Sequence, residues 1–241
     1  MRFLAMIPAR YAATRFPAKL MQLLGDKPVI VHTYLNTVAT GLFDDVMVVT
    51  DSQLIFDTIV SYGGKAIMSK KSHESGSDRI AEAIDNMDVE IVVNVQGDEP
   101  FVQKKPLESL LSLFADDGKK DVQVASLMQE LHETKYIEDP NYVKVVVDKN
   151  MNALLFSRSM VPYPRNTDNH HTYFEHIGIY AFRKEALMKF TNWDITPLES
   201  VEKIECLRYL EHGVPIKMLV TKYMGVEIDT PEDLERAAKL L

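Results

Sequence analysis

The sequence has little cysteine and no long apolar run. Cys206 is its single cysteine among 241 residues, which excludes an intramolecular disulfide. The helical pattern around Cys206 favours a packed thiol over a nucleophile. The five apolar residues before Pro8 are too few for a signal-peptide core, and no later run reaches membrane-spanning length. We therefore expect a cytoplasmic protein without membrane insertion.

Basic residues do not predominate. The chain has 27 Lys+Arg against 35 Asp+Glu, a formal net charge of −8, and this acidic balance argues against general nucleic-acid binding. A chain of this length can bury a large core. We expect one α/β domain over residues 1–241, with a small additional lobe at about 100–185, because no repeat or long linker divides the sequence.

Strand and helix patterns alternate through the first hundred residues. Such alternation implies right-handed crossovers and a mostly parallel central sheet. The expected strands are 3–7, 46–50, 65–68 and 91–95, and the expected helices are 28–40, 51–62 with Asp51 as N-cap, and 78–87. Beyond them we expect strands at 122–127, 143–148, 153–157, 177–182 and 216–220, and helices at 106–114, from 184, at 200–212 and after a cap at Thr230. A turn at 150–152 predicts a hairpin between two of these strands.

The segment after the first strand has neither glycine nor acid. Arg10, Arg15 and Lys19 fall in it, and no acidic residue occurs before Asp26. Three cations at the carboxyl end of a strand predict a site for a multiply charged anion, since open α/β sheets bind ligands there. The absence of glycine excludes a Walker A loop and a GxGxxG turn. On these residues alone, a solvated basic loop is an equal alternative.

Two further segments carry carboxylates. Asp98 and Glu99 follow the strand at 91–95, where they could hold Mg²⁺ against phosphate oxygens. The alternative is a tight turn with two solvated acids. Asp229 precedes the last helix and could serve only its N-cap, but Thr230 before Pro231 fits the cap better and leaves Asp229 available for a metal ion.

Several short motifs together resemble one family. The motifs are IPARY at 7–11, RFPAK at 15–19, HESGSDR at 73–79, NVQGDEP at 94–100, FSR at 156–158, HIGIY at 176–180 and DTPED at 229–233. In these motifs, which follow the family's order and cover nearly the whole sequence, the chain is similar to the 3-deoxy-D-manno-octulosonate (Kdo) cytidylyltransferases, or CMP-Kdo synthetases.

The resemblance implies a Rossmann-like nucleotide-diphospho-sugar transferase fold and a homodimer. It implies a nucleotidyltransferase that converts CTP and Kdo to CMP-Kdo and pyrophosphate for lipopolysaccharide biosynthesis. The family's nucleotide-binding positions correspond to Pro8, Ala9, Arg10, Arg15, Lys19, Ser75, Gly76 and Arg79. Its Mg²⁺ carboxylates correspond to Asp98 and Asp229, which with Arg10 and Lys19 are the expected catalytic residues. Its sugar-acid pocket corresponds to Gln96, Arg158, His176, Tyr180 and Glu199.

The sequence also departs from the family pattern. The family commonly has Ser, Leu, Gly and Pro at the positions of Ala13, Phe16, Ala18 and Leu20, and Gly is more usual at Glu227. Because Ala18 replaces a residue with wider backbone freedom, we expect a slightly different loop. Two alternatives remain open: activation of another sugar acid, such as 8-amino-Kdo or a sialic acid, and a nucleotide-sugar-binding module without turnover. The missing glycine fingerprint disfavours a Rossmann dehydrogenase.

Overall fold

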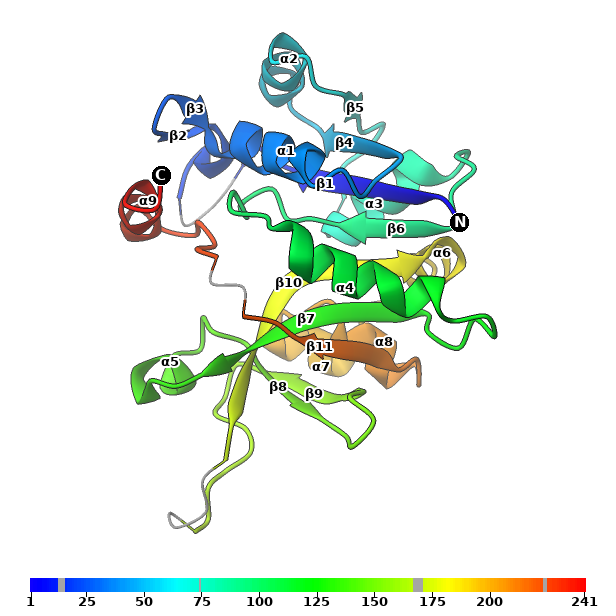
Figure 1. Cartoon of the computed structure of the whole chain (residues 1–241), viewed down its shortest axis with the longest axis vertical. Helices are drawn as coiled ribbons and strands as arrows, with labels where there is room; N and C mark the ends of the chain where they lie inside the picture. The colour runs from blue at the N-terminus through cyan, green and yellow to red at the C-terminus, as the bar shows by residue number, and fades with distance from the viewer. Residues whose placement is uncertain (13–15, 74, 167–170, 223–224) are drawn as a thin grey trace. The chain divides into compact units, whose positions relative to one another are not determined.

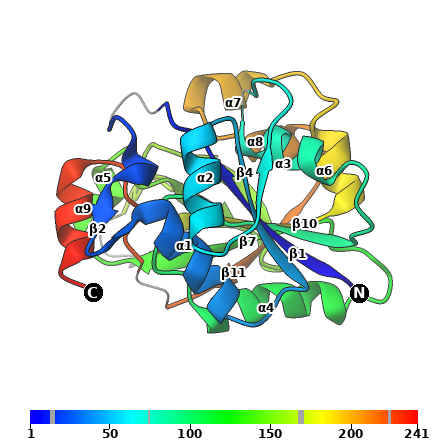
Figure 2. The same ribbon diagram turned by 90° about the horizontal axis from the view of Figure 1, so that it is seen from above.

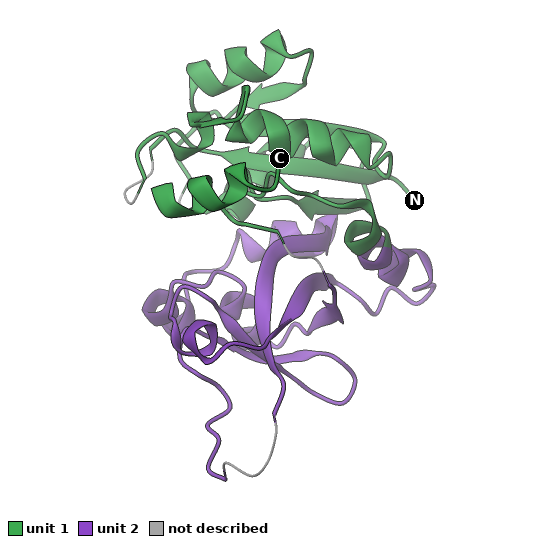
Figure 3. Ribbon diagram, turned by 60° about the vertical axis from the view of Figure 1, so that its left-hand side comes forward, with its two compact units in different colours: residues 1–108, 224–241 green, residues 109–223 purple. Residues whose placement is uncertain are grey.

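The chain forms two compact units. The structure, a computed structural model, describes residues 1–12, 16–73, 75–166, 171–222 and 225–241. Unit 1 comprises residues 1–108 and 224–241, and unit 2 comprises residues 109–223 (Figure 3). No helix among the described residues is long and apolar enough to cross a membrane. That the lobe at 100–185 binds sugar or forms a dimer stays a prediction.

The sheet of unit 1 is parallel. Its strands are β1 (Phe3–Ala9), β4 (Asp45–Thr50), β5 (Ala66–Met68) and β6 (Ile91–Asn94). They pair in the order β6-β1-β4-β5. Met6, Ile7 and Val92 are completely buried, as expected for strands covered on both faces. The predicted strands and their parallel arrangement are confirmed.

Helices cover both faces of this sheet. They are α1 (Val29–Ala39), α2 (Gln53–Ser61) and α3 (Gly76–Ile84), whereas the C-terminal α9 (Pro231–Ala238) contacts the segment Leu23–Leu24. Helices α1 and α3 lie on opposite sides of β1 (Figures 1 and 2). A short 3₁₀ helix, η1 (Lys19–Met21), and a small hairpin of β2 (Leu23–Leu24) and β3 (Lys27–Pro28) connect β1 to α1.

Two predicted helix starts in unit 1 are wrong by one or two residues. Ser52 rather than Asp51 caps α2, because its side chain accepts a hydrogen bond from the Ile55 amide. Ser75 likewise accepts one from the Asp78 amide, so α3 begins at Gly76 instead of at 78. A serine hydroxyl at either position satisfies an amide that the helix itself leaves without a partner.

Unit 2 combines a mixed sheet with short helices. After α4 (Lys104–Ala115), it contains β7 (Val124–Leu131), α5 (Thr134–Glu138), β8 (Lys144–Val147), β9 (Ala153–Ser157), β10 (Tyr173–Arg183), α6 (Lys184–Phe190), α7 (Pro197–Glu202), α8 (Leu207–Glu211) and β11 (Ile216–Val220). Strand β7 lies between β11, which is parallel to it, and β10, which is antiparallel. The predicted β8–β9 hairpin is confirmed.

The predicted single helix at 200–212 is wrong. The chain instead forms α7 and α8, and Lys203 ends α7 with φ 54°, in the left-handed region. A capping box between Thr196 and Glu199 begins α7 at Pro197, earlier than predicted. The apolar spacing alone could not reveal this break, because it continues across both helices.

Candidate active site

The basic segment begins where β1 ends. Pro8 and Ala9 are buried at the end of the strand, and Arg10, the next residue, is exposed. Ala18 has φ 51° and ψ 32°, so the position before Lys19 is left-handed. A left-handed backbone is one that glycine adopts without steric cost, whereas alanine does not. That the loop differs slightly from the family's stays a prediction. Arg15 lies outside the described residues.

Lys19 joins two carboxylates from distant parts of the sequence. Its Nζ donates a hydrogen bond to Oδ2 of Asp98, which lies in the loop after β6. It also donates to Oδ1 of Asp229, just before α9, at 2.7 Å. Burial alone would lower the pKa of Lys19, but the two ion pairs outweigh burial and raise it. Lys19 therefore carries its charge throughout the physiological pH range.

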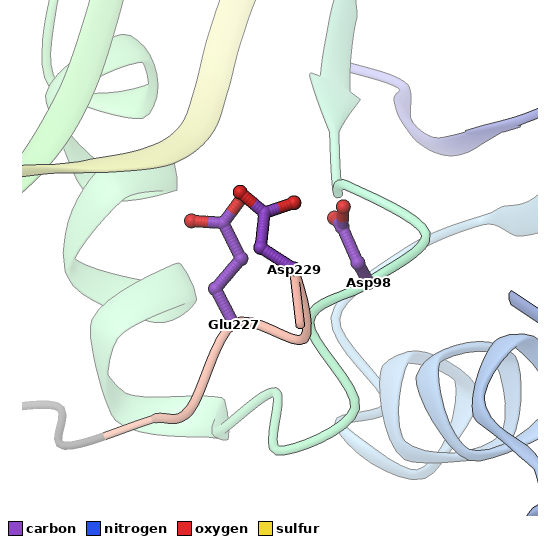
Figure 4. Close-up of side chains that lie close together, drawn as sticks. All are labelled: Asp98, Glu227 and Asp229. Carbon is purple, nitrogen blue, oxygen red and sulfur yellow. The ribbon is translucent and has the colours of Figure 1, made fainter. Parts of the chain in front are cut away.

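A third carboxylate joins this pair. One oxygen each of Asp98, Glu227 and Asp229 lies within 4.8 Å of the others, and Figure 4 shows the three side chains converging. Removal from bulk water and repulsion by neighbouring carboxylates, Asp98 foremost, raise the pKa of Glu227. The crowding of negative charge around Glu227 therefore disfavours its ionised form. Oxygen ligands of this kind suit Mg²⁺.

Backbone hydrogen bonds hold the segment that carries two of these carboxylates. The Ile228 amide donates to the Asp98 carbonyl at 3.0 Å, and the Ile228 side chain is completely buried. Asp233 Oδ2 accepts from the amides of Asp229 and Thr230, while Thr230 caps α9 through the Asp233 amide. The expectation that Thr230, and not Asp229, caps this helix is confirmed.

A pocket of unit 1 collects the predicted nucleotide-binding residues. Its volume is about 190 Å³, and its lining includes Arg10 and Lys19, the two predicted cations of the basic segment that lie among the described residues. Gln96 also lines it, as do Leu20, His73 and Gly97, to which the sequence analysis assigns no binding role. The predicted residues in this lining are Pro8, Ala9, Arg10, Lys19, Ser75, Gly76, Arg79, Gln96 and Asp98. Their binding roles stay predictions.

Two features fix the wall that α3 provides. Arg79 is buried, and its guanidinium donates to Asp51 Oδ2 at 2.7 Å and to Ser69 Oγ at 2.8 Å. A Cβ at Gly76 would lie 3.2 Å from Cγ of Pro8, so glycine allows the start of α3 to approach the end of β1 closely. The wall is therefore preorganised before any ligand binds.

The other predicted sugar-acid residues belong to unit 2. His176 and Tyr180 project from β10 with ring centroids 5.1 Å apart. Burial lowers the pKa of His176 to about 3 and raises the pKa of Tyr180. The Tyr180 hydroxyl also forms a hydrogen bond with the Cys206 thiol. Cys206 is buried and burial raises its pKa, so the predicted packed thiol is confirmed.

Arg158 and Glu199 are already engaged by protein groups. Arg158 donates from Nε to the Glu202 carbonyl at 2.7 Å and from Nη1 to the Pro140 carbonyl at 2.9 Å. Glu199 forms a buried ion pair with Arg208, at 2.5 and 2.7 Å. These contacts give both residues a structural role in unit 2, and their sugar-binding roles stay predictions.

Sequence comparisons identify full-length relatives. A family model described as cytidylyltransferase matches residues 4–219. The 3-deoxy-manno-octulosonate cytidylyltransferase of Flavobacterium johnsoniae is 62% identical, over 100% of this chain and 99% of the relative. The protein of the same name from Christiangramia forsetii is 57% identical, over 100% of this chain and 97% of the relative.

Solved structures share the fold. The structure of CMP:2-keto-3-deoxy-manno-octonic acid synthetase complexed with CTP matches with a TM-score of 0.93 and 35% identity, over 100% of this chain and 98% of that chain. A 4-diphosphocytidyl-2C-methyl-D-erythritol synthase from Anaerococcus prevotii, at 15% identity and a TM-score of 0.64 over 99% and 98% of the two chains, shares the fold alone. The chain therefore belongs to the 3-deoxy-manno-octulosonate cytidylyltransferase family, an α/β family of nucleotide-diphospho-sugar transferase fold.

Proposed function

We propose that this protein transfers CMP from CTP to the anomeric hydroxyl of Kdo and releases pyrophosphate, for lipopolysaccharide biosynthesis in the cytoplasm. The observation that carries the proposal is the full-length match, at 62% identity, to a relative named for this activity. The pocket of unit 1 supports it, because cations and carboxylates meet there at the carboxyl ends of parallel strands.

The proposed chemistry needs cations that stabilise negative charge on the substrates, and it needs no covalent nucleophile. The sugar hydroxyl attacks the α-phosphorus in line, while Arg10, Arg15 and Lys19 bind the triphosphate. CTP and the sugar carboxylate repel each other, so these cations offset the repulsion and stabilise the leaving pyrophosphate. Pro8, Ala9, Ser75, Gly76 and Arg79 position the nucleotide, and Gln96, Arg158, His176, Tyr180 and Glu199 receive the sugar acid.

We assign Mg²⁺ to Asp98 and Asp229. Both are oxygen donors, both face the ammonium of Lys19, and the cluster carries more carboxylates than cations, so the residues fit a hard divalent cation. When bound, the ion stabilises negative charge on phosphate oxygens. Asp98 and Asp229 hold it, and Lys19 balances the charge of the same carboxylates.

The metal assignment has its own test. Asp98→Asn at saturating Mg²⁺ should lower turnover by about 10²–10³-fold, the usual loss when a group that stabilises transition-state charge is removed. Asp88→Asn, at an exposed position away from the pocket, is the matched control and should keep wild-type turnover. Near-normal turnover of Asp98→Asn would show that the metal role is wrong.

The activity is tested by pyrophosphate release. CTP and Mg²⁺ are incubated in parallel with Kdo, 8-amino-Kdo or N-acetylneuraminate, and ATP and UTP replace CTP as nucleotide controls. We expect release with CTP and Kdo alone. Release with a different acid would reassign the substrate, and silence with every acid, despite CTP binding in calorimetry, would favour a binding module.

A further inference from the structure

We propose that Glu227 is a third carboxylate ligand of the divalent cation, beside Asp98 and Asp229. The inference rests on the proposed function, because it concerns the ion assigned to the same cluster. Glu227 lies outside the DTPED motif at 229–233, so the ligand would be additional to the carboxylate that this motif supplies.

The backbone places Glu227 next to both aspartates. Glu227 and Asp229 flank Ile228. The Ile228 side chain is buried and its amide donates a hydrogen bond to the Asp98 carbonyl, so both interactions hold the segment against the loop after β6. Figure 4 shows the carboxyl groups of Glu227 and Asp229 adjacent to each other, with Asp98 facing them from its loop. The three oxygens lie within 4.8 Å, a separation that one ion can span with ligand distances of about 2.0–2.6 Å.

Glu227 is the carboxylate of the cluster with no cation of its own. Lys19 is paired with Asp98 and Asp229, whereas Glu227 has neither a hydrogen bond nor an ion pair among the described residues. One ammonium faces three carboxylates, and a divalent cation would offset the repulsion that remains among them.

A cation already lies among these side chains. The Nζ of Lys19 is within hydrogen-bond reach of Asp98 and Asp229, so the geometry of the two aspartates accommodates positive charge between them. This observation is independent of Glu227. It shows that Asp98 and Asp229, whose side chains are 13% and 27% exposed, already share one cation.

The test measures metal affinity directly. The full-length protein is titrated with Mn²⁺, and the free ion is followed by electron paramagnetic resonance, for the wild type, Glu227→Gln and Glu227→Gly. We expect both variants to bind Mn²⁺ about tenfold more weakly, the lower end of the loss for residues that support a metal site. Glu232→Gln, which neutralises an exposed acid in the first turn of α9, should keep wild-type affinity.

Thermal unfolding distinguishes ligation from a structural role. Without metal, Glu227→Gln should unfold at the wild-type temperature or above it, because the substitution removes repulsion among carboxylates; with Mn²⁺, its gain in melting temperature should be smaller. Wild-type Mn²⁺ affinity in Glu227→Gln, with weakened binding in Asp98→Asn, would overturn the role of Glu227 alone. Unchanged affinity in Asp98→Asn and Asp229→Asn as well would overturn the metal assignment in the proposed function.

Discussion

His176 is kept neutral by the residues around it. Its Nε2 lies 3.0 Å from Ser126 Oγ, and the rings of Phe156 and Tyr180 contact it at centroid distances of 4.8 and 5.1 Å. None of these neighbours compensates a positive charge, so burial lowers the pKa of His176 from 6.5 to about 3. Protonation of the unfolded chain therefore opposes folding between these two values.

This pKa shift predicts a stability change with a definite sign. The imidazole of His176 binds a proton below about pH 6.5 in the unfolded chain, but only near pH 3 in the folded chain. The stability that neutral His176 contributes is therefore complete above pH 6.5 and is lost as the pH falls toward 3. The free energy of unfolding should fall by at most about 1.4 kcal/mol per pH unit from this residue. Urea unfolding of the wild type and His176→Gln between pH 7 and 5 measures the difference in slope.

The comparison isolates one histidine from the other titrating groups. His132→Gln changes a histidine whose side chain is 77% exposed, and it should keep the wild-type slope. Equal slopes in the wild type and His176→Gln would mean that His176 is protonated in the folded protein, contrary to its surroundings.

At the scale of elements, η1 begins from a strained residue. Ala18 has φ 51°, a region that costs a residue with a Cβ roughly 1–2 kcal/mol relative to glycine. Ala18→Gly should stabilise the protein by about 0.5–1 kcal/mol after the added entropy of the unfolded chain is deducted. For a protein of this size, the melting temperature should then rise by about 1–4 °C.

A second Ala→Gly substitution should change the stability in the opposite direction. Ala39 is exposed at the end of α1 in an ordinary helical conformation, so Ala39→Gly should destabilise by about 0.5–1 kcal/mol. If both variants melt below the wild type, the left-handed conformation of Ala18 is not a source of strain.

Helices α7 and α8 depend on one buried ion pair. Glu199 accepts from Arg208 Nε and Nη2, and its carboxylate also accepts from the Thr196 amide at 3.3 Å. Glu199→Gln should cost roughly 3–5 kcal/mol, because it leaves the Arg208 charge buried without its partner. Thermal unfolding should fall by about 10 °C, given the usual 2–4 °C per kcal/mol at this size.

The double variant separates structure from substrate binding. Replacing both Glu199 and Arg208 by methionine should restore much of the lost stability, since a buried pair can be exchanged for apolar groups at little cost. If the restored variant also keeps the wild-type KM for Kdo, Glu199 serves the fold alone. A large rise in KM in the restored variant would support the predicted sugar-acid role.

Element existence could be predicted better than element boundaries. Continuous apolar runs predicted β1, β4 and β6, because strands buried on both faces need no polar alternation. The starts of α2 and α3 depend on which nearby hydroxyl reaches a free amide, and the break at Lys203 depends on a left-handed residue that is not glycine. The spacing of apolar residues predicts neither the helix starts nor the break.

At the scale of the whole molecule, the site could be predicted where its residues follow strand ends. Lys19 and Asp98 meet although they are far apart in sequence, because the parallel strands β1 and β6 bring their carboxyl ends to one edge. Asp229 joins them from the segment before α9. The resemblance does not predict a role for Glu227, because this residue departs from the family pattern and lies outside the motifs. The pairing of Glu199 with Arg208 depends on tertiary contacts that short motifs do not encode.

Self-association is the last expectation that the family resemblance raises. Unit 2 exposes two large apolar side chains inside the predicted lobe, Leu154 on the β8–β9 hairpin at 61% and Tyr163 at 79%. Burial of such surface between two copies would contribute about 25 cal/mol per Å² to association. We predict a homodimer at micromolar concentration, measured by size-exclusion chromatography with light scattering, and a shift toward monomer in Leu154→Asp/Tyr163→Asp.

The control for this shift is an equally exposed leucine in the other unit. Leu54 on α2 is 51% exposed, and Leu54→Asp adds the same charge outside the lobe, so it should keep the dimer. Loss of the dimer in Leu54→Asp alone would move the interface to unit 1. A monomeric wild type would contradict the prediction outright, and the exposed side chains of unit 2 would then be ordinary surface residues, since apolar atoms make up much of any protein surface.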